Sequence, residues 1–194
     1  MDFWTDHPNW AAYRINNPYR PVAWASVAGW IGYEAQPEYY AYGDNVYYQD
    51  DAVYSESQQV ATADEYADQA AALASSASDT KPQDAEWLPL GVFALTQDNQ
   101  SSGPTPSSYM QLAISKDAVI SGIQKNTVTG ESETIEGAAD KKTQRVAWVV
   151  KGRSPIIETG LADLTKDTVP ALIHFADGQT QQWLLVRLPE PKEN

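Results

Sequence analysis

The chain has 194 residues, of which 42% are hydrophobic, and its formal net charge at pH 7 is −13. So acidic a surface repels phosphate backbones and anionic membranes, and we therefore expect no nucleic-acid partner. The chain contains no cysteine, which excludes disulfides, thiol catalysis and cysteine-ligated metal.

The charge divides the chain into two unequal parts. Residues 1–80 carry 12 acidic and 2 basic residues, whereas residues 81–194 carry 14 acidic and 11 basic ones. The sequence predicts an acidic, aromatic-rich arm over 1–80 and a separate β domain over 86–190, joined by a linker rich in Ser, Asp, Lys and Pro.

The start of the arm is exceptionally aromatic, with four tryptophans and nine tyrosines in the first 54 residues. Flat aromatic faces make broad contacts and dominate many interfaces. Three interpretations stay open: the arm packs on the β domain, it adheres to a glycan or a partner protein, or it is partly disordered in isolation. The predicted ligand or partner contacts are Trp4, Trp10, Trp24, Trp30, Tyr40, Tyr42 and Tyr47.

Three short elements are expected in the arm. Trp24, Val27 and Ile31 recur at helical spacing and predict a helix within 21–33. Tyrosine- and valine-containing runs at 39–42, 46–48 and 52–54, separated by Gly, Asp and Asn, predict a small antiparallel hairpin over 38–60.

The third element is a helix over 62–76. Thr62 and Glu65 form an S/T-x-x-E capping box, in which each side chain accepts a hydrogen bond from the other residue's backbone N–H. The Ala-rich sequence that follows is weakly amphipathic, with Tyr66, Ala70 and Leu73 along one face, so the helix should lie on the surface of a larger body.

From residue 87 onward the sequence predicts β structure. Hydrophobic residues alternate with others in several short segments, as in Met110, Leu112 and Ile114, and turn residues separate the segments. Asp177-Gly178 is the sharpest hairpin signal. This rhythm favours an antiparallel meander barrel or a closed sandwich. The eight predicted strands are 87–96, 109–115, 118–125, 131–138, 144–151, 155–164, 170–176 and 181–188.

Five runs of the chain resemble a family of uncharacterised, chiefly planctomycetal proteins that are predicted to be exported and are sometimes labelled cell-surface or protocadherin-like. The runs are YYAYGDNVYY at 39–48, ATADEY at 61–66, EWLPLGVFAL at 86–95, PALIHF at 170–175 and QQWLLVRL at 181–188. The resemblance implies an exported or cell-envelope location, although the chain opens without the features of a signal peptide.

The strand rhythm of residues 109–188 also resembles that of avidin-like and lipocalin-like eight-stranded meanders. VISG at 119–122 and TQQWLL at 180–185 carry this likeness. It implies a topology only, because the family's polar ligand-binding set has no residue-by-residue counterpart in this chain.

No catalytic motif is present in the sequence, and we predict no catalytic residue, no metal ligand and no cofactor. His7 is expected in a loop and His174 as an ordinary strand histidine. Carboxylates such as Glu158 and Asp163 are expected on solvated faces. Turns with Asp and Asn at 44–45 and 50–51 are read as turn-forming, with calcium as the alternative.

The leading hypothesis is therefore a non-enzymatic envelope or cell-surface protein that binds a protein or polysaccharide, without a membrane span. The alternative is a small-ligand carrier that uses the barrel mouth and has a cavity on the order of hundreds of Å³. A hydrolase is third, and it requires His174 to lie beside a carboxylate in a cleft.

Overall fold

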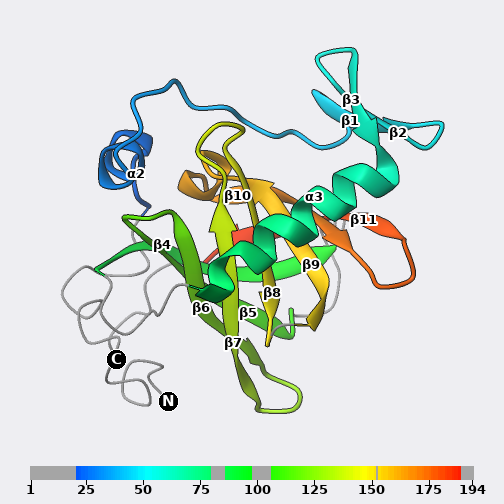
Figure 1. Cartoon of the computed structure of the whole chain (residues 1–194). Helices are drawn as coiled ribbons and strands as arrows, with labels where there is room; N and C mark the ends of the chain where they lie inside the picture. Colours follow the sequence, from blue (N-terminus) through cyan, green and yellow to red (C-terminus); the bar gives the residue numbers. More distant parts are fainter. Residues whose placement is uncertain (1–20, 80–85, 98–105, 152, 189–194) are drawn as a thin grey trace.

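The computed structural model describes residues 21–79, 86–97, 106–151 and 153–188. Eight antiparallel strands close into a barrel, in which each strand pairs with the next one along the chain and β11 pairs back with β4 (Figure 1). The strands are β4 (Trp87–Gln97), β5 (Ser108–Ser115), β6 (Val119–Asn126), β7 (Ser132–Ala139), β8 (Arg145–Val150), β9 (Arg153–Gly160), β10 (Thr168–His174) and β11 (Thr180–Arg187). The prediction of a mainly β chain with an eight-stranded barrel is confirmed.

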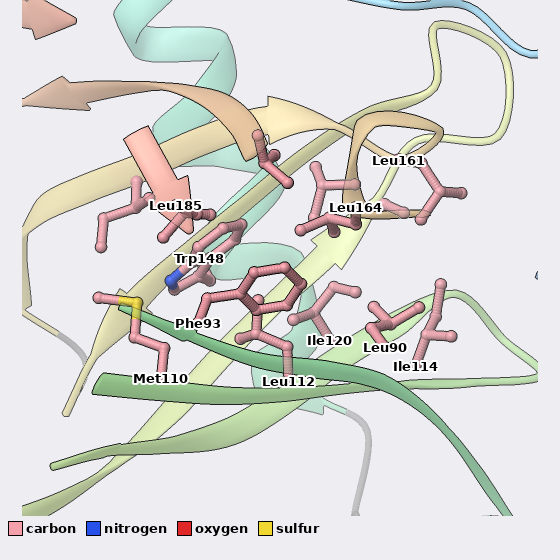
Figure 2. Close-up of a cluster of buried hydrophobic side chains, with 14 of the residues drawn as sticks. Leu90, Phe93, Met110, Leu112, Ile114, Ile120, Trp148, Leu161, Leu164 and Leu185 are labelled. Carbon is pink, nitrogen blue, oxygen red and sulfur yellow. The ribbon is translucent and has the colours of Figure 1, made fainter. Parts of the chain in front are cut away.

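Alternation along the strands decides which side chains enter the barrel. Met110, Leu112 and Ile114 of β5 point inward, as do Val146 and Trp148 of β8, and all five are buried (Figure 2). Adjacent side chains of a strand point to opposite faces, so residues two positions apart on a strand share the interior.

Trp148 needs a glycine on the neighbouring strand. Gly137 of β7 pairs with Trp148, and a Cβ built on Gly137 would lie 2.5 Å from the Trp148 Cβ. The nearest atom to the Cβ built on Gly137 would be the Ala147 carbonyl oxygen, at 2.2 Å, so the absence of a side chain lets β7 and β8 approach closely here.

On β11 the inward face is not the one that hydrophobicity suggests. The apolar trio Leu184, Val186 and Leu188 shares the outer face, whereas Leu185 and Arg187 are buried. The Arg187 guanidinium donates hydrogen bonds to the carbonyls of Leu90 (2.8 Å) and Leu164 (2.7 Å). These carbonyls satisfy the buried cation, although burial still lowers the pKa of Arg187.

One end of the barrel is covered by α2 (Trp24–Trp30) and is called the α2 end. Val27 and Ile31 belong to the same apolar core as the barrel interior, and Trp30 Nε1 donates to the Ile114 carbonyl at 3.1 Å. The predicted strand 155–164 is too long, because β9 stops at Gly160 and a 3₁₀ turn, η4 (Asp163–Thr165), follows. That turn places the side chain of Leu164 in the core at this end (Figure 2).

The helix α3 (Ala63–Ser75) lies across the outside of the barrel over β7 and β8, and a short 3₁₀ turn, η2 (Ser76–Asp79), continues it (Figure 1). Its capping box is formed as predicted: Thr62 Oγ1 accepts from the Glu65 N–H at 3.2 Å, and Glu65 Oε2 accepts from the Thr62 N–H at 2.9 Å. Ala70 and Ala74 pack on Ala147, so small side chains let the helix approach the barrel wall closely.

A three-stranded sheet precedes α3, formed by β1 (Val46–Gln49), β2 (Ala52–Ser55) and β3 (Gln58–Thr62). A small sheet here was predicted, but its first strand was placed wrongly at 39–42. That segment bonds to the barrel instead: the Tyr40 N–H donates to Asp163 and the Tyr42 carbonyl accepts from Gln182. The third strand, β3, was missed because its sequence is polar and exposed.

In the ranges that the structure describes, none of the helices combines the length and the apolar character needed to span a lipid bilayer.

Candidate functional site

A cavity of about 440 Å³ occupies the barrel end opposite α2, which we call the cavity end. At this end β4, β6, β8 and β10 finish and β5, β7, β9 and β11 begin. The cavity is lined by Leu95, Ser107, Ser108, Gln124, Glu133, Val150, Arg153, Ser154, Pro155, Ile157, Ile173, Phe175 and Trp183.

The deep walls of this cavity are apolar, formed by Leu95, Val150, Ile157, Ile173 and the aromatic rings of Phe175 and Trp183. Beyond it the barrel interior is solid, because side chains such as Phe93, Met110 and Trp148 are fully buried there (Figure 2). The cavity is therefore a pocket with a bottom, and not a channel through the barrel.

The rim of the cavity carries charge. Glu133 Oε1 accepts a hydrogen bond from Lys151 Nζ at 3.1 Å and from Arg153 Nη2 at 3.2 Å. The side chains of Lys151 and Arg153 are 62% and 67% exposed and that of Glu133 is 27% exposed, so this cluster faces solvent. Glu133 and Arg153 line the cavity itself.

Two buried polar atoms in this part of the barrel have no hydrogen-bond partner among the described residues: Ser108 Oγ, on the cavity wall, and Trp148 Nε1, deeper in the core. In Figure 2 the indole nitrogen lies on the Met110 side of the Trp148 ring, away from Leu161 and Leu164 at the α2 end. A buried polar atom without a partner costs about 1–3 kcal/mol, so each of these two atoms is a local cost to the stability of the barrel.

A second polar cluster lies on the outer wall of the barrel, beneath the arm. Glu158 of β9 accepts from Arg145 Nε at 2.6 Å through Oε1, and its Oε2 lies 2.8 Å from His174 Nε2. The other ring nitrogen of His174 lies 3.0 Å from Thr180 Oγ1. The prediction of solvated carboxylates is wrong for Glu158, which is fully buried, because the arm covers this part of the outer wall.

The cover over this cluster comes from α3 and from the tyrosines before it. Arg145 Nη1 donates to Gln69 Oε1 at 2.6 Å and Nη2 donates to the Tyr66 carbonyl at 3.0 Å, while the guanidinium stacks 3.7 Å from the centre of the Tyr66 ring. The hydroxyls of Tyr42 and Tyr66 are buried and have no partner among the described residues. Burial raises the pKa of both tyrosines, and the Glu158 carboxylate raises it further.

A histidine hydrogen-bonded to a carboxylate can act in acid–base chemistry. Here, however, Glu158 is 0% exposed and His174 is 3% exposed, so the pair is covered rather than placed in a cleft. The arrangement fits a role in holding the arm on the barrel.

Asp163 makes a second attachment of the arm. It was also expected on a solvated face, and this expectation is wrong, because Asp163 is buried. Its Oδ2 accepts from the Tyr40 backbone N–H at 2.7 Å and its Oδ1 pairs with Lys166 Nζ at 2.9 Å. Burial raises the pKa of Asp163, and these two donors oppose that shift.

Of the seven predicted contact residues, Trp4 and Trp10 lie outside the described residues, as does His7. The half-buried Trp24 donates from Nε1 to the Ala35 carbonyl at 3.1 Å, and Trp30 packs at the α2 end. Their contacts in this structure are within the chain.

The three tyrosines of that set lie elsewhere. Tyr40 and Tyr42 pack on the outer wall, and the Tyr47 ring stacks on Tyr54 with centroids 5.4 Å apart. Whether any of the seven side chains contacts a ligand or partner stays a prediction.

The Asp and Asn residues at 44–45 and 50–51, for which calcium binding was the alternative interpretation, have roles in their own turns. Asn45 Oδ1 accepts from the Ala41 N–H at 2.8 Å, and Asp50 and Asp51 have positive φ angles of 49° and 61° in the β1–β2 turn. Such turns favour Asp and Asn for their backbone geometry. In the part of the chain that the structure describes, no three His, Asp or Glu side chains are grouped so that they could hold a metal ion.

Comparison of the chain with protein-family models, with curated proteins and with solved structures found no match. The two resemblances stated from the sequence therefore stay predictions.

Proposed function

We propose that this protein binds a small, largely apolar molecule in the cavity end of the barrel. The cavity itself is the observation that carries the proposal: its volume of about 440 Å³ lies within the range of about 300–1,000 Å³ that is usual for small-molecule sites. Its apolar walls and small polar rim are also the composition expected of such a site.

The packing of the barrel supports the same function. Residues of α2 and η4 fill the α2 end with apolar side chains, so a ligand has one end to occupy. The fully buried side chains of Trp148 and Phe93 limit how deep the ligand can go. Side chains thus fill the barrel interior at the α2 end and in the middle. The part left open at the cavity end has walls and a floor made of side chains.

The envelope or cell-surface function predicted from the aromatic arm is less well supported. Trp24, Trp30, Tyr40 and Tyr42 make their contacts with other residues of the chain, which leaves less of their surface for a partner. Export to the envelope stays a prediction, and it is compatible with a ligand-binding barrel.

Fluorescence of N-phenyl-1-naphthylamine, a neutral apolar dye that emits strongly in apolar surroundings, tests the proposal. The wild-type protein should bind the dye with saturable affinity. Leu95→Trp places a larger side chain in the cavity and should weaken dye binding at least about tenfold, which is 1.4 kcal/mol. Val186→Trp, which places the same large side chain on the exposed outer face of β11, is the control.

Circular dichroism and the unfolding midpoint of both variants establish that they are folded. Dye binding that is absent in the wild type, or equal in the two folded tryptophan variants, would contradict a binding function for the cavity.

A further inference from the structure

Three charged residues at the rim of the cavity form a cluster with a net positive charge. Lys151 and Arg153 both bond to one oxygen of Glu133, so two cations share a single carboxylate and this cluster carries a net charge of +1. The chain as a whole carries −13, so an anion is not attracted to this protein by its overall charge. A local preference for an anion at this rim would therefore be a property of these three residues.

Of the two cations, Arg153 is the one placed to meet a ligand. It lines the cavity, whereas Lys151 is outside the lining set. Its guanidinium has five N–H donors, and one nitrogen, Nη2, bonds to Glu133. The planar fork of an arginine matches the two oxygens of a carboxylate, and such charge-assisted pairs are roughly twice as strong as neutral hydrogen bonds.

The apolar walls determine how a charged ligand would be oriented. An ionised group taken into the space among Ile157, Ile173 and Trp183 would lose its hydration without a partner, which is strongly unfavourable. At the rim the same group stays partly hydrated and can also accept a hydrogen bond from the exposed Ser154. The apolar part of the ligand would then lie inside and the anion outside.

We propose that the ligand is an apolar molecule with one anionic end, a carboxylate or a group of similar geometry, which Arg153 binds at the rim of the cavity. This inference rests on the proposed function, because it assigns the chemical class of the molecule that the cavity takes.

A matched pair of probes tests the role of the anion: decanoate and decan-1-ol, which have chains of the same length and differ in the charged group. Each is titrated against the dye complex of the full-length protein, below the concentration at which decanoate forms micelles. Decanoate should displace the dye at a concentration about tenfold lower than decan-1-ol, a difference of 1.4 kcal/mol.

Three variants locate the effect. Arg153→Gln should weaken decanoate about tenfold more than it weakens decan-1-ol, because only decanoate carries the anion that Arg153 would bind. Lys151→Gln, which removes a similarly exposed cation outside the lining, should weaken decanoate less than about threefold, because Lys151 would act on the anion only from a distance, where salt screens the charge. Glu133→Gln removes the carboxylate that competes for Arg153 and should strengthen decanoate binding.

The outcomes separate this inference from the proposed function. If the dye does not bind, or if its affinity is the same for the wild type and for Leu95→Trp, the proposed function is refuted. If the dye binds in the cavity but Arg153→Gln shifts decanoate and decan-1-ol equally, or shifts neither, then the anionic ligand is refuted and an apolar neutral ligand remains. Circular dichroism and the unfolding midpoint of Arg153→Gln establish that the variant is folded.

Discussion

At the scale of single residues, the buried charges on the outer wall are what hold the arm in place. Glu158 pairs with Arg145 and His174, and Arg145 in turn reaches Gln69 and the Tyr66 carbonyl of α3. A buried ion pair adds little stability as a whole, because its desolvation offsets its attraction. Removing one partner is different, since it leaves the other charge buried and uncompensated.

Glu158→Ala should therefore lower the free energy of unfolding by about 3–5 kcal/mol, because it leaves the Arg145 cation without its carboxylate. Urea unfolding followed by circular dichroism measures the loss. Glu136→Ala, on the exposed face of β7, is the control and should stay within about 0.5 kcal/mol of the wild type. A similar small effect for both variants would mean that the cluster does not hold the arm.

The buried tyrosines give the fold a dependence on alkaline pH. Burial raises the pKa of Tyr42 and Tyr66 above the ordinary value of 10.0. Because the folded protein keeps these protons while the unfolded chain releases them, the stability that they contribute is present below pH 10 and is lost above it. The loss is about 1.4 kcal/mol per pH unit for each tyrosine.

The double variant Tyr42→Phe with Tyr66→Phe should lose stability above pH 10 less steeply than the wild type. At pH 7 it should be as stable or slightly more stable, because it removes two buried hydroxyls that have no partner among the described residues. Urea unfolding at pH 7, 10 and 11 measures how the free energy of unfolding changes with pH in the wild type and in the double variant. Parallel curves for the two proteins would show that these hydroxyls do not control the alkaline transition.

At the scale of elements, α3 combines a local signal with a tertiary role. The capping box sets where the helix begins, and the helix then places Tyr66 and Gln69 over Arg145. Helices of this length are marginal in isolation, so packing on β7 and β8 supplies most of their stability. Both the capping box and the packing of α3 on the barrel are therefore needed to keep Arg145 and Glu158 covered.

Thr62→Ala should destabilise the protein by about 1 kcal/mol, because the Glu65 N–H at the first turn loses its acceptor. Thr62→Ser keeps the hydroxyl and should lose little. Thermal unfolding of the two variants side by side provides the comparison. Equal midpoints would imply that water replaces the cap without loss.

At the scale of the whole molecule, the arm completes the barrel in two places. Residues of α2 belong to the core at the α2 end, and Tyr40, Tyr42 and α3 cover charged side chains on the outer wall. The division into an arm over 1–80 and a β domain over 86–190 stays a prediction. A folded barrel without its arm would expose to solvent the core side chains that Val27 contacts at the α2 end. It would also expose Glu158 on the outer wall.

A chain that begins at residue 81 should accordingly be much less stable than the full-length protein. Loss of the arm removes the apolar contacts of Val27 and Ile31 and uncovers the Arg145–Glu158 pair. Circular dichroism and urea unfolding of the truncated chain measure this directly. A truncated chain with the full-length unfolding midpoint would instead show that the barrel is an independent domain.

The sequence by itself determined a body of eight strands, the alternation of Met110, Leu112 and Ile114 on β5, and the start of α3. These features depend on neighbours within a few residues, since alternation along a strand and a capping box are local patterns. On β11 alternation alone does not identify the inward face, because carbonyls from distant segments make an inward arginine acceptable.

Only the tertiary structure decided what the arm covers and which part of the barrel stays empty. The burial of Glu158 depends on Tyr66, whose carbonyl accepts from Arg145 across 79 positions of sequence. The cavity depends on how eight strand ends meet and on which side chains are large enough to fill the space between them. Neither depends on a pattern within one segment, because both arise where segments distant in sequence contact each other.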